Sequence, residues 1–270
     1  MKNLKTKISN LQLISILICT RLVFLLSSFS FLNLDFNLSI FIYLLVSNTI
    51  TIFLFFVFSK ITLPKALCVF ITIISIAIIL FVSLISFSSA SYKLNLFFLI
   101  FLFLVAAIYG AFRGIESISR VSFLIVIAFI ILFSLSLLGF LKNNIYYNLS
   151  SFSLNISPYF LVLNVGFIEA FIYSMLRKNM VGGNLLFIYF IITIITSLFI
   201  IAIIYGVLGN VATSYPFPFF SACSVSKSGF IRRLDVFFNC FYILISLITA
   251  SSLFYILASL FKKGDKNEEH

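Results

Sequence analysis

The chain has 270 residues, of which 63% are hydrophobic and 9% are charged, and its formal net charge is +11. Soluble domains average about 45–50% apolar and about 25% charged residues, so this composition excludes a soluble fold and predicts an integral membrane protein. The positive charge does not indicate nucleic-acid binding, because the Lys and Arg residues are scattered at the ends of apolar runs.

Eight stretches contain the roughly 20 predominantly apolar residues that a membrane-spanning helix needs. In chain order they cover residues 10–32, 37–59, 66–88, 94–112, 120–141, 157–176, 184–209 and 234–261. The stretches are continuously apolar and do not alternate, which favours helices over barrel strands. The predicted fold class is therefore all-α: a polytopic membrane helix bundle of about eight transmembrane helices, forming one domain over residues 1–270.

The basic residues between these stretches predict the orientation of the bundle. With a cytoplasmic N-terminus, 12 Lys and Arg residues lie inside and five lie outside, and Arg21 falls within the first span. Cytoplasmic loops of membrane proteins carry an excess of Lys and Arg. We therefore expect both termini to be cytoplasmic.

The sequence AFRGIESISR, residues 111–120, places three charges between the fourth and fifth apolar stretches. On one helix, Arg113 and Glu116 are three residues apart, and Glu116 and Arg120 are four apart, so both pairs would meet on one face. Gly114 permits a break in the helix. We interpret this group as a structural charge cluster in an inner loop.

Glu169 lies near the middle of the sixth stretch. A charge at the centre of a membrane helix costs at least about 2.5–3.5 kcal/mol, so the carboxylate needs a partner or a polar cavity. Arg21 is the other charged residue at comparable depth. Our hypothesis is that the two side chains pair or share one polar cavity. The alternatives are a neutral Glu169 that bonds to backbone or Ser, a purely structural ion pair, and a direct role in binding a ligand or ion.

The segment 210–235 contains two prolines and is too interrupted to span a membrane. We predict an outer re-entrant or interfacial loop over residues 210–233 that packs on the bundle, because non-helical backbone at membrane depth needs protein or water around it. In the eighth stretch, Asn239, Tyr242 and Ser246 recur at helical spacing, as residues lining a cavity would.

Hydroxyl side chains in three other stretches are expected to pack between helices and bond their own backbone. They are Thr49, Thr51, Thr72, Ser75, Thr193 and Thr196. The four cysteines are far apart and the single histidine is His270, so we expect no metal site and no cofactor. Because no nucleophile–base pair or phosphate-binding loop is present, we assign no catalytic residues and expect no enzymatic activity.

Several motifs in the same order along the chain resemble one known family. They are ISNLQL (8–13), the G-x-E-x-x-x-R pattern of Gly114, Glu116 and Arg120, VGFIEAF (165–171), SYP (214–216) and FIRRLD (230–235). Together they resemble the B subunits of spore nutrient germinant receptors (GerAB-type proteins). This family belongs to the amino acid–polyamine–organocation permease superfamily.

The resemblance implies an amino-acid-transporter fold of two inverted five-helix repeats. The eighth stretch is followed by nine residues, so we expect that fold to be incomplete, shortened at the C-terminus by two helices. Ligands of that fold bind near the midplane, where the first and sixth helices are broken. The candidate ligand-binding residues are Arg21, Gly166, Glu169, Asn239 and Tyr242. The resemblance also implies a structural clamp on the outer loop, formed by Tyr215, Pro216, Arg233 and Asp235.

The function implied is that of a membrane subunit that senses a small nutrient, such as an amino acid, to trigger germination. The expected partners are the lipid bilayer, the A-type and C-type receptor subunits and the nutrient itself, and the expected location is the bacterial cytoplasmic membrane or the spore inner membrane. Two alternatives remain open: an amino-acid permease, and a degenerate scaffold subunit that binds no ligand.

Overall fold

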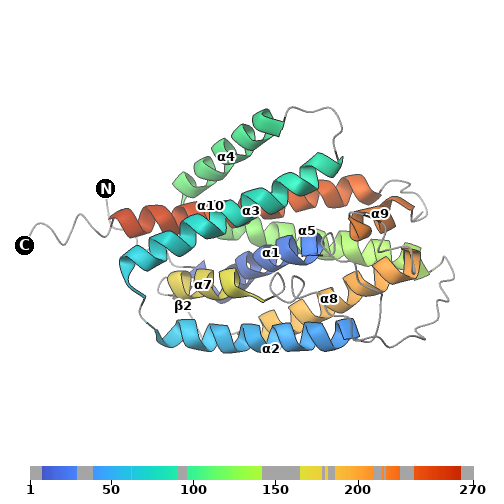
Figure 1. Cartoon of the computed structure of the whole chain (residues 1–270), viewed down its shortest axis with the longest axis horizontal. Helices are drawn as coiled ribbons and strands as arrows, with labels where there is room; N and C mark the ends of the chain where they lie inside the picture. The colour runs from blue at the N-terminus through green and yellow to red at the C-terminus, as the bar shows by residue number, and fades with distance from the viewer. Residues whose placement is uncertain are drawn as a thin grey trace, which may run out of the picture.

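A computed structural model shows the chain as a bundle of helices (Figure 1). The structure describes residues 8–28, 39–61, 63–90, 96–141, 165–177, 180–181, 186–208, 215, 217–225 and 234–262. Its elements are β1 (Ile8–Ser9), α1 (Asn10–Ser28), α2 (Ser39–Lys60), α3 (Lys65–Ala90), α4 (Leu96–Arg113), α5 (Ile115–Leu141), α7 (Phe167–Leu176), β2 (Met180–Val181), α8 (Leu186–Leu208), α9 (Pro218–Val225) and α10 (Leu234–Lys262).

Each of the eight predicted stretches overlaps one of the helices α1, α2, α3, α4, α5, α7, α8 and α10. Among the described residues, five helices are long and apolar enough to cross a membrane: α1, α3, α5, α8 and α10. Shorter apolar helical segments lie in α2, α4 and α7. The prediction of an all-α membrane helix bundle is therefore confirmed, whereas the number of crossings and the two-repeat architecture stay predictions.

Helix α1 is the central helix of the bundle. Of the residues from Asn10 to Ser27 in α1, 83% are buried. In the apolar segments of α3, α5 and α8 that are long enough to cross a membrane, 39% of the residues are buried. It contacts α5, α10, α7 and α8, and Figure 1 shows it surrounded by the other helices. A helix that is apolar on all sides is stable only when other helices or lipid cover it. Four polar side chains of α1 are buried among the other helices: Ser15, Thr20, Arg21 and Ser27.

The start of α1 is held by two local interactions that use the ISNLQL motif. The Ser9 backbone N–H donates to Gln12 Oε1 at 3.1 Å, and the Gln12 backbone N–H donates to Ser9 Oγ at 3.3 Å. This reciprocal capping satisfies donors that the first helical turn leaves unpaired. Strand β1 also pairs in parallel with β2, Ile8 opposite Met180. The beginning of α1 is thereby tied to the chain that follows α7.

The hydroxyl side chains singled out in the sequence bond as predicted. All six donate to backbone carbonyls three or four residues earlier in their own helices. In an apolar environment this keeps a hydroxyl satisfied without a partner helix. Thr51 additionally accepts a hydrogen bond from another segment, as described below.

The charge cluster differs from the prediction. Helix α5 begins at Ile115 and not at about residue 120, and only Gly114 separates it from α4, so residues 111–120 form two helix ends and not a loop. Glu116 forms an exposed ion pair with Arg120, as predicted. Arg113 instead donates to the Tyr109 hydroxyl, so its predicted pairing with Glu116 is wrong. The reason is Gly114, whose φ of 88° turns the chain between the two helices.

The segment between α8 and α10 contributes the short helix α9, which packs against both of them. The ring centroids of Phe219 and Phe238 are 5.1 Å apart, and those of Phe220 and Tyr242 are 5.8 Å apart. Helix α9 therefore packs on the bundle, whereas the outer re-entrant or interfacial loop over residues 210–233 stays a prediction. The other residues of the segment before α10 lie outside the described part of the chain.

Gly114 provides a test of the turn between α4 and α5. We expect Gly114→Ala to destabilise the protein by about 1–2 kcal/mol, because a Cβ in the left-handed region is strained although nothing lies within 4 Å of the position it would occupy. Gly114→Asn should cost less, since Asn tolerates this conformation. Thermal unfolding of the purified variants measures both. Equal stability of wild type and Gly114→Ala would show that the turn adopts another conformation.

Candidate functional site

Helix α7 is half the length of a membrane-spanning helix. Its 10 residues rise about 15 Å, roughly half the thickness of the hydrocarbon core. Figure 1 shows α7 beside one half of α2, with its first turn directed toward the middle of the bundle. The predicted helix over 157–176 is wrong at Val165 and Gly166, which are not helical, and residues 157–164 lie outside the described part. The N-terminus of α7 therefore lies inside the bundle.

Gly166 forms the start of α7 through a contact with α2. Its backbone N–H donates to Thr51 Oγ1 at 2.9 Å. A Cβ at Gly166 would lie 2.5 Å from Thr51 Cγ2 and 3.2 Å from Glu169 Oε2. Only glycine allows this close approach of backbone to side chain. One otherwise unpaired donor of a buried helix start is thus satisfied by another helix.

Glu169 in the first turn of α7 and Arg21 of α1 form a buried ion pair. Arg21 Nη1 lies 3.8 Å from Glu169 Oε1, and each side chain is 1% exposed. Moving an isolated charge from water into an apolar interior costs several kcal/mol, which an opposite charge offsets. The positive end of the helix dipole also favours a carboxylate in the first turn. The pairing predicted for Arg21 and Glu169 is confirmed.

Tyr189 of α8 is the fourth polar side chain of this site, after Thr51, Glu169 and Arg21. It is 1% exposed and interacts electrostatically with both Glu169 and Arg21. Among the described residues, neither its hydroxyl nor Glu169 Oε1 has a hydrogen-bond partner. Since buried polar groups in proteins are nearly always hydrogen-bonded, these two atoms have unused capacity to bind a polar group.

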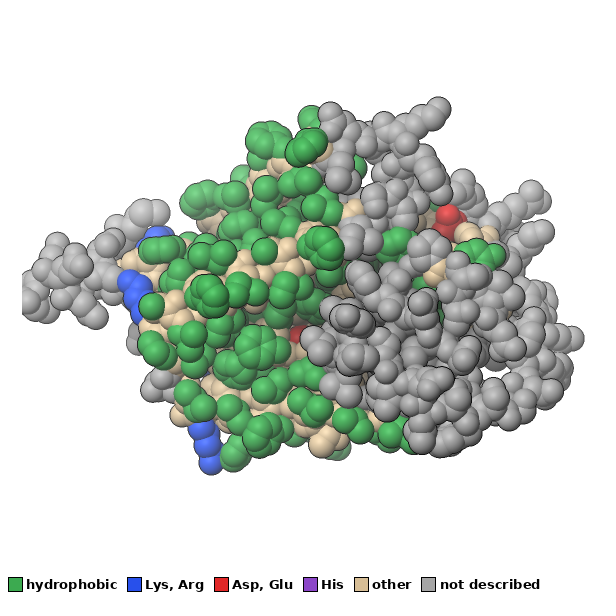
Figure 2. Space-filling model, in the orientation of Figure 1, with side chains coloured by type: hydrophobic (Ala, Val, Ile, Leu, Met, Phe, Trp, Pro, Cys, Tyr) green, Lys and Arg blue, Asp and Glu red, His purple; other side chains and the backbone are tan. Residues whose placement is uncertain are grey.

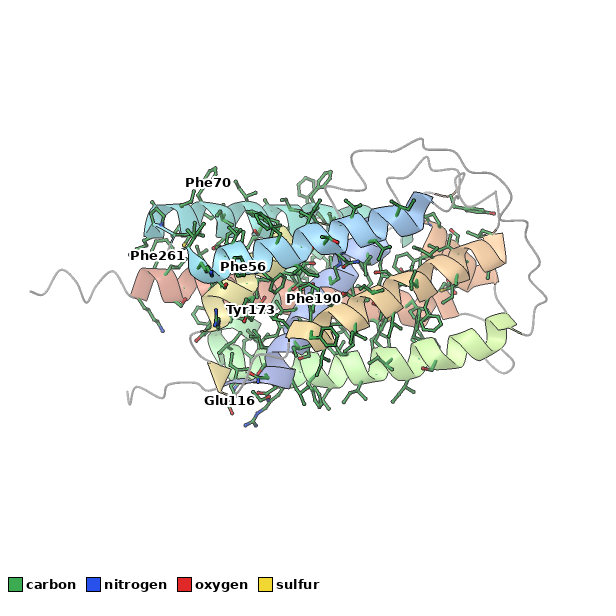
Figure 3. The ribbon with its side chains drawn as sticks, turned by 90° about the horizontal axis from the view of Figure 1, so that it is seen from below. Phe56, Phe70, Glu116, Tyr173, Phe190 and Phe261 are labelled. Carbon is green, nitrogen blue, oxygen red and sulfur yellow. The ribbon has the colours of Figure 1, made fainter. Side chains whose placement is uncertain are left out.

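An aromatic group lines the same region. Phe55 of α2 has its ring centroid 5.2 Å from Tyr173 of α7 and 5.5 Å from Tyr189. Phe190 of α8 lies 5.6 Å from Phe55, and Figure 3 shows Tyr173 and Phe190 where α7 and α8 approach each other. The rings of Phe55 and Phe190 place apolar surface next to Tyr189, which interacts electrostatically with both members of the ion pair. In such surroundings each charge interacts more strongly with a polar group than it would in water.

The arrangement combines one positive charge, one negative charge, a free hydroxyl and a helix N-terminus within a buried region. A small molecule carrying both an anionic and a cationic group would find a complementary partner for each. The described residues here offer binding groups and no nucleophile–base pair. Recognition of a small polar molecule is the chemistry that this geometry supports.

The structure brings together three of the predicted ligand-binding residues: Arg21, Gly166 and Glu169. Tyr242 instead packs its ring on Phe220 of α9, and Asn239 is half-buried one turn before it. Their proposed role in binding stays a prediction.

Of the predicted outer-loop clamp, Tyr215 is partly exposed, and Asp235 lies in the first turn of α10 and interacts electrostatically with Cys223 of α9. Pro216 and Arg233 lie outside the described residues. The clamp stays a prediction.

Sequence reasoning missed the site roles of Thr51 and Tyr189. Thr51 was interpreted as a packing residue that bonds its own helix, which it also does through the Ser47 carbonyl. Tyr189 lies in a long apolar run, and tyrosine at such a position is ordinary for a membrane helix. No local pattern marks either residue, because both reach the site only through the packing of α2 and α8 against α7 and α1.

Comparisons with models of protein families, with curated proteins and with solved structures gave no match.

The ion pair predicts a strong coupling between its two members. We expect Arg21→Met or Glu169→Leu alone to lower the free energy of unfolding by about 3–5 kcal/mol, because each leaves the other charge buried without its partner. The double variant should be less destabilised than the sum of the two. A double-mutant cycle from unfolding in detergent measures this. If the two costs simply add, the side chains do not interact.

The Gly166–Thr51 contact predicts a compensating pair of substitutions. Gly166→Ala should destabilise the protein, because its Cβ would overlap the Thr51 methyl group. Adding Thr51→Ser removes that methyl group and keeps the oxygen that accepts the Gly166 N–H. We therefore expect Thr51→Ser to restore part of the melting temperature lost in Gly166→Ala while having a small effect by itself. If Thr51→Ser restored none of the lost melting temperature, the destabilisation by Gly166→Ala would not come from a clash with the Thr51 methyl group.

Proposed function

We propose that this chain is the membrane subunit of a spore nutrient germinant receptor, of the B type, and that it senses a small nutrient such as an amino acid. The observation that carries the proposal is the buried Arg21–Glu169 pair at the start of half-helix α7. The order of the family-like motifs supports the same assignment. Under this proposal the A-type and C-type subunits are its partners.

An amino acid fits the chemistry of the pair. Its carboxylate would interact with Arg21 and the N-terminal turn of α7, and its ammonium group with Glu169. Binding would then exchange the internal ion pair for two ion pairs with the ligand. Because α1 and α7 each carry one member of the pair, such an exchange would alter how these two helices are held together. That is a physical route from binding to a signal.

The proposed orientation has both termini in the cytoplasm, in the bacterial cytoplasmic membrane or the spore inner membrane. It is supported by the described cations at helix ends. Lys60, Arg113, Arg177 and Lys262 end helices, and Lys65 begins one. The positive-inside rule places such an end on the cytoplasmic side.

Two other functions are each favoured by one observation. A half-helix that begins inside the bundle is also typical of secondary transporters, which favours a permease. Conversely, α1 runs unbroken from Asn10 to Ser28, so it offers no second helix N-terminus to a ligand, which favours a scaffold subunit. The experiment below separates the three functions.

The test is the thermal unfolding of the purified protein with a panel of amino acids. At a hundredfold excess over its dissociation constant, a ligand that binds only the folded state stabilises it by about 2.7 kcal/mol. We expect at least one amino acid to raise the melting temperature of the wild type and to leave Glu169→Gln unchanged. Gln keeps an oxygen near Arg21, so the variant should fold.

Glu116→Gln is the matched control, because it makes the same substitution in the exposed Arg120–Glu116 ion pair. The side chain of Arg120 is 69% exposed and that of Glu116 is 45% exposed. It should keep the response to the ligand. No response of the wild type to any amino acid would favour the scaffold function. Accumulation of the ligand in proteoliposomes would favour the permease.

A further inference from the structure

Three helices end with the same pair of residues, an aromatic ring four positions before a cation. In each pair the cation lies over the ring: Lys60 Nζ is 4.2 Å from the Phe56 centroid, Arg113 Cζ is 5.1 Å from the Tyr109 centroid, and Arg177 Cζ is 5.9 Å from the Tyr173 centroid. A cation over a ring face is attracted by the ring quadrupole, and the negative end of the helix dipole adds to this attraction. The three cations are thus held at the ends of α2, α4 and α7.

These cations belong to a strongly positive end of the bundle, here called the basic end. It comprises six exposed residues: Lys60, Lys65, Arg113, Arg120, Arg177 and Lys262. Among the described residues of this end, the acidic residue is Glu116, which pairs with Arg120. Glu116 therefore balances one of the six positive charges and leaves the other five. Figure 2 shows Lys and Arg side chains at the end of the bundle where α2 and α10 end and α3 begins. At the other end of α10 the described charge is Asp235.

The basic end continues directly into apolar surface. On α2, Phe53 and Phe56 are more than half exposed next to Lys60, and on α3, Phe70 is 61% exposed one turn beyond Lys65. Ile61, directly after α2, is also more than half exposed. A molecule that covers this surface must present hydrocarbon to the rings and an anion to the cations.

We propose that the basic end binds anionic phospholipids, with Lys60 at the end of α2, Lys65 at the start of α3 and Arg113 at the end of α4 contacting their headgroup phosphates. A phospholipid carries both required parts in one molecule. A soluble polyanion such as a nucleic acid offers no acyl chains for the exposed rings. The rings hold each cation at the level where the apolar surface ends, which is the depth of the phosphate layer. This inference does not depend on the proposed sensing function.

The test uses the purified full chain in detergent, titrated with dioleoylphosphatidylglycerol or dioleoylphosphatidylcholine, with bound lipids counted by native mass spectrometry. We expect tighter binding of phosphatidylglycerol, weakened by added salt. Each cation near an anionic surface contributes about 1 kcal/mol, which is roughly fivefold in affinity, so Lys60→Gln with Lys65→Gln should weaken that binding about 25-fold. Arg113→Gln should weaken it about fivefold.

Two control variants distinguish a specific contact from a general loss of charge. Arg120→Gln removes a cation already paired with Glu116 and should change the affinity for phosphatidylglycerol less than twofold. Lys60→Arg with Lys65→Arg keeps the charge and should keep the preference. Three results would overturn the proposal: equal binding of the two lipids by the wild type, equal weakening by Arg120→Gln and Arg113→Gln, or equally tight binding of free glycerol phosphate, which would indicate a site for a soluble anion.

Discussion

The structure depends on one interaction, the ion pair between Arg21 and Glu169 in the interior of an apolar bundle. Neither charge would be stable there alone, and together they join the central helix α1 to the half-helix α7. Most contacts in this bundle are between apolar side chains, which also pack well against lipid. They therefore specify the neighbours of a helix only weakly. A buried pair of opposite charges has one satisfactory arrangement, and it sets the register of α1 against α7.

The surroundings of this pair explain why α7 starts inside the bundle. A helix N-terminus in a membrane needs partners for its unpaired N–H groups, and Thr51 supplies one to Gly166. The helix dipole and the carboxylate of Glu169 then act on the same small volume, beside the hydroxyl of Tyr189. The site is thus built from four helices, and each contributes one polar side chain: Arg21, Thr51, Glu169 and Tyr189.

The charges of this protein fall into two classes with different roles. The buried pair lies where the dielectric is low, so its geometry and its partners dominate its energy. The cations of the basic end are exposed, and their interactions with each other are weak and screened by salt. Exposed cations matter here through their number and their common location at one end of the bundle. Glu116 and Arg120 belong to this second class, although the sequence places them in a compact and conspicuous group.

The amino-acid sequence by itself determined the membrane class, the position of each long helix and the need for Arg21 and Glu169 to find partners. These follow from hydropathy and from the cost of burying a charge, which depend on composition over short stretches. The tertiary structure alone decided that α7 begins at Phe167 and that Thr51 and Tyr189 join the site. Such features arise from helices packing across distant parts of the chain. No local pattern encodes which side of an evenly apolar helix will meet its neighbour.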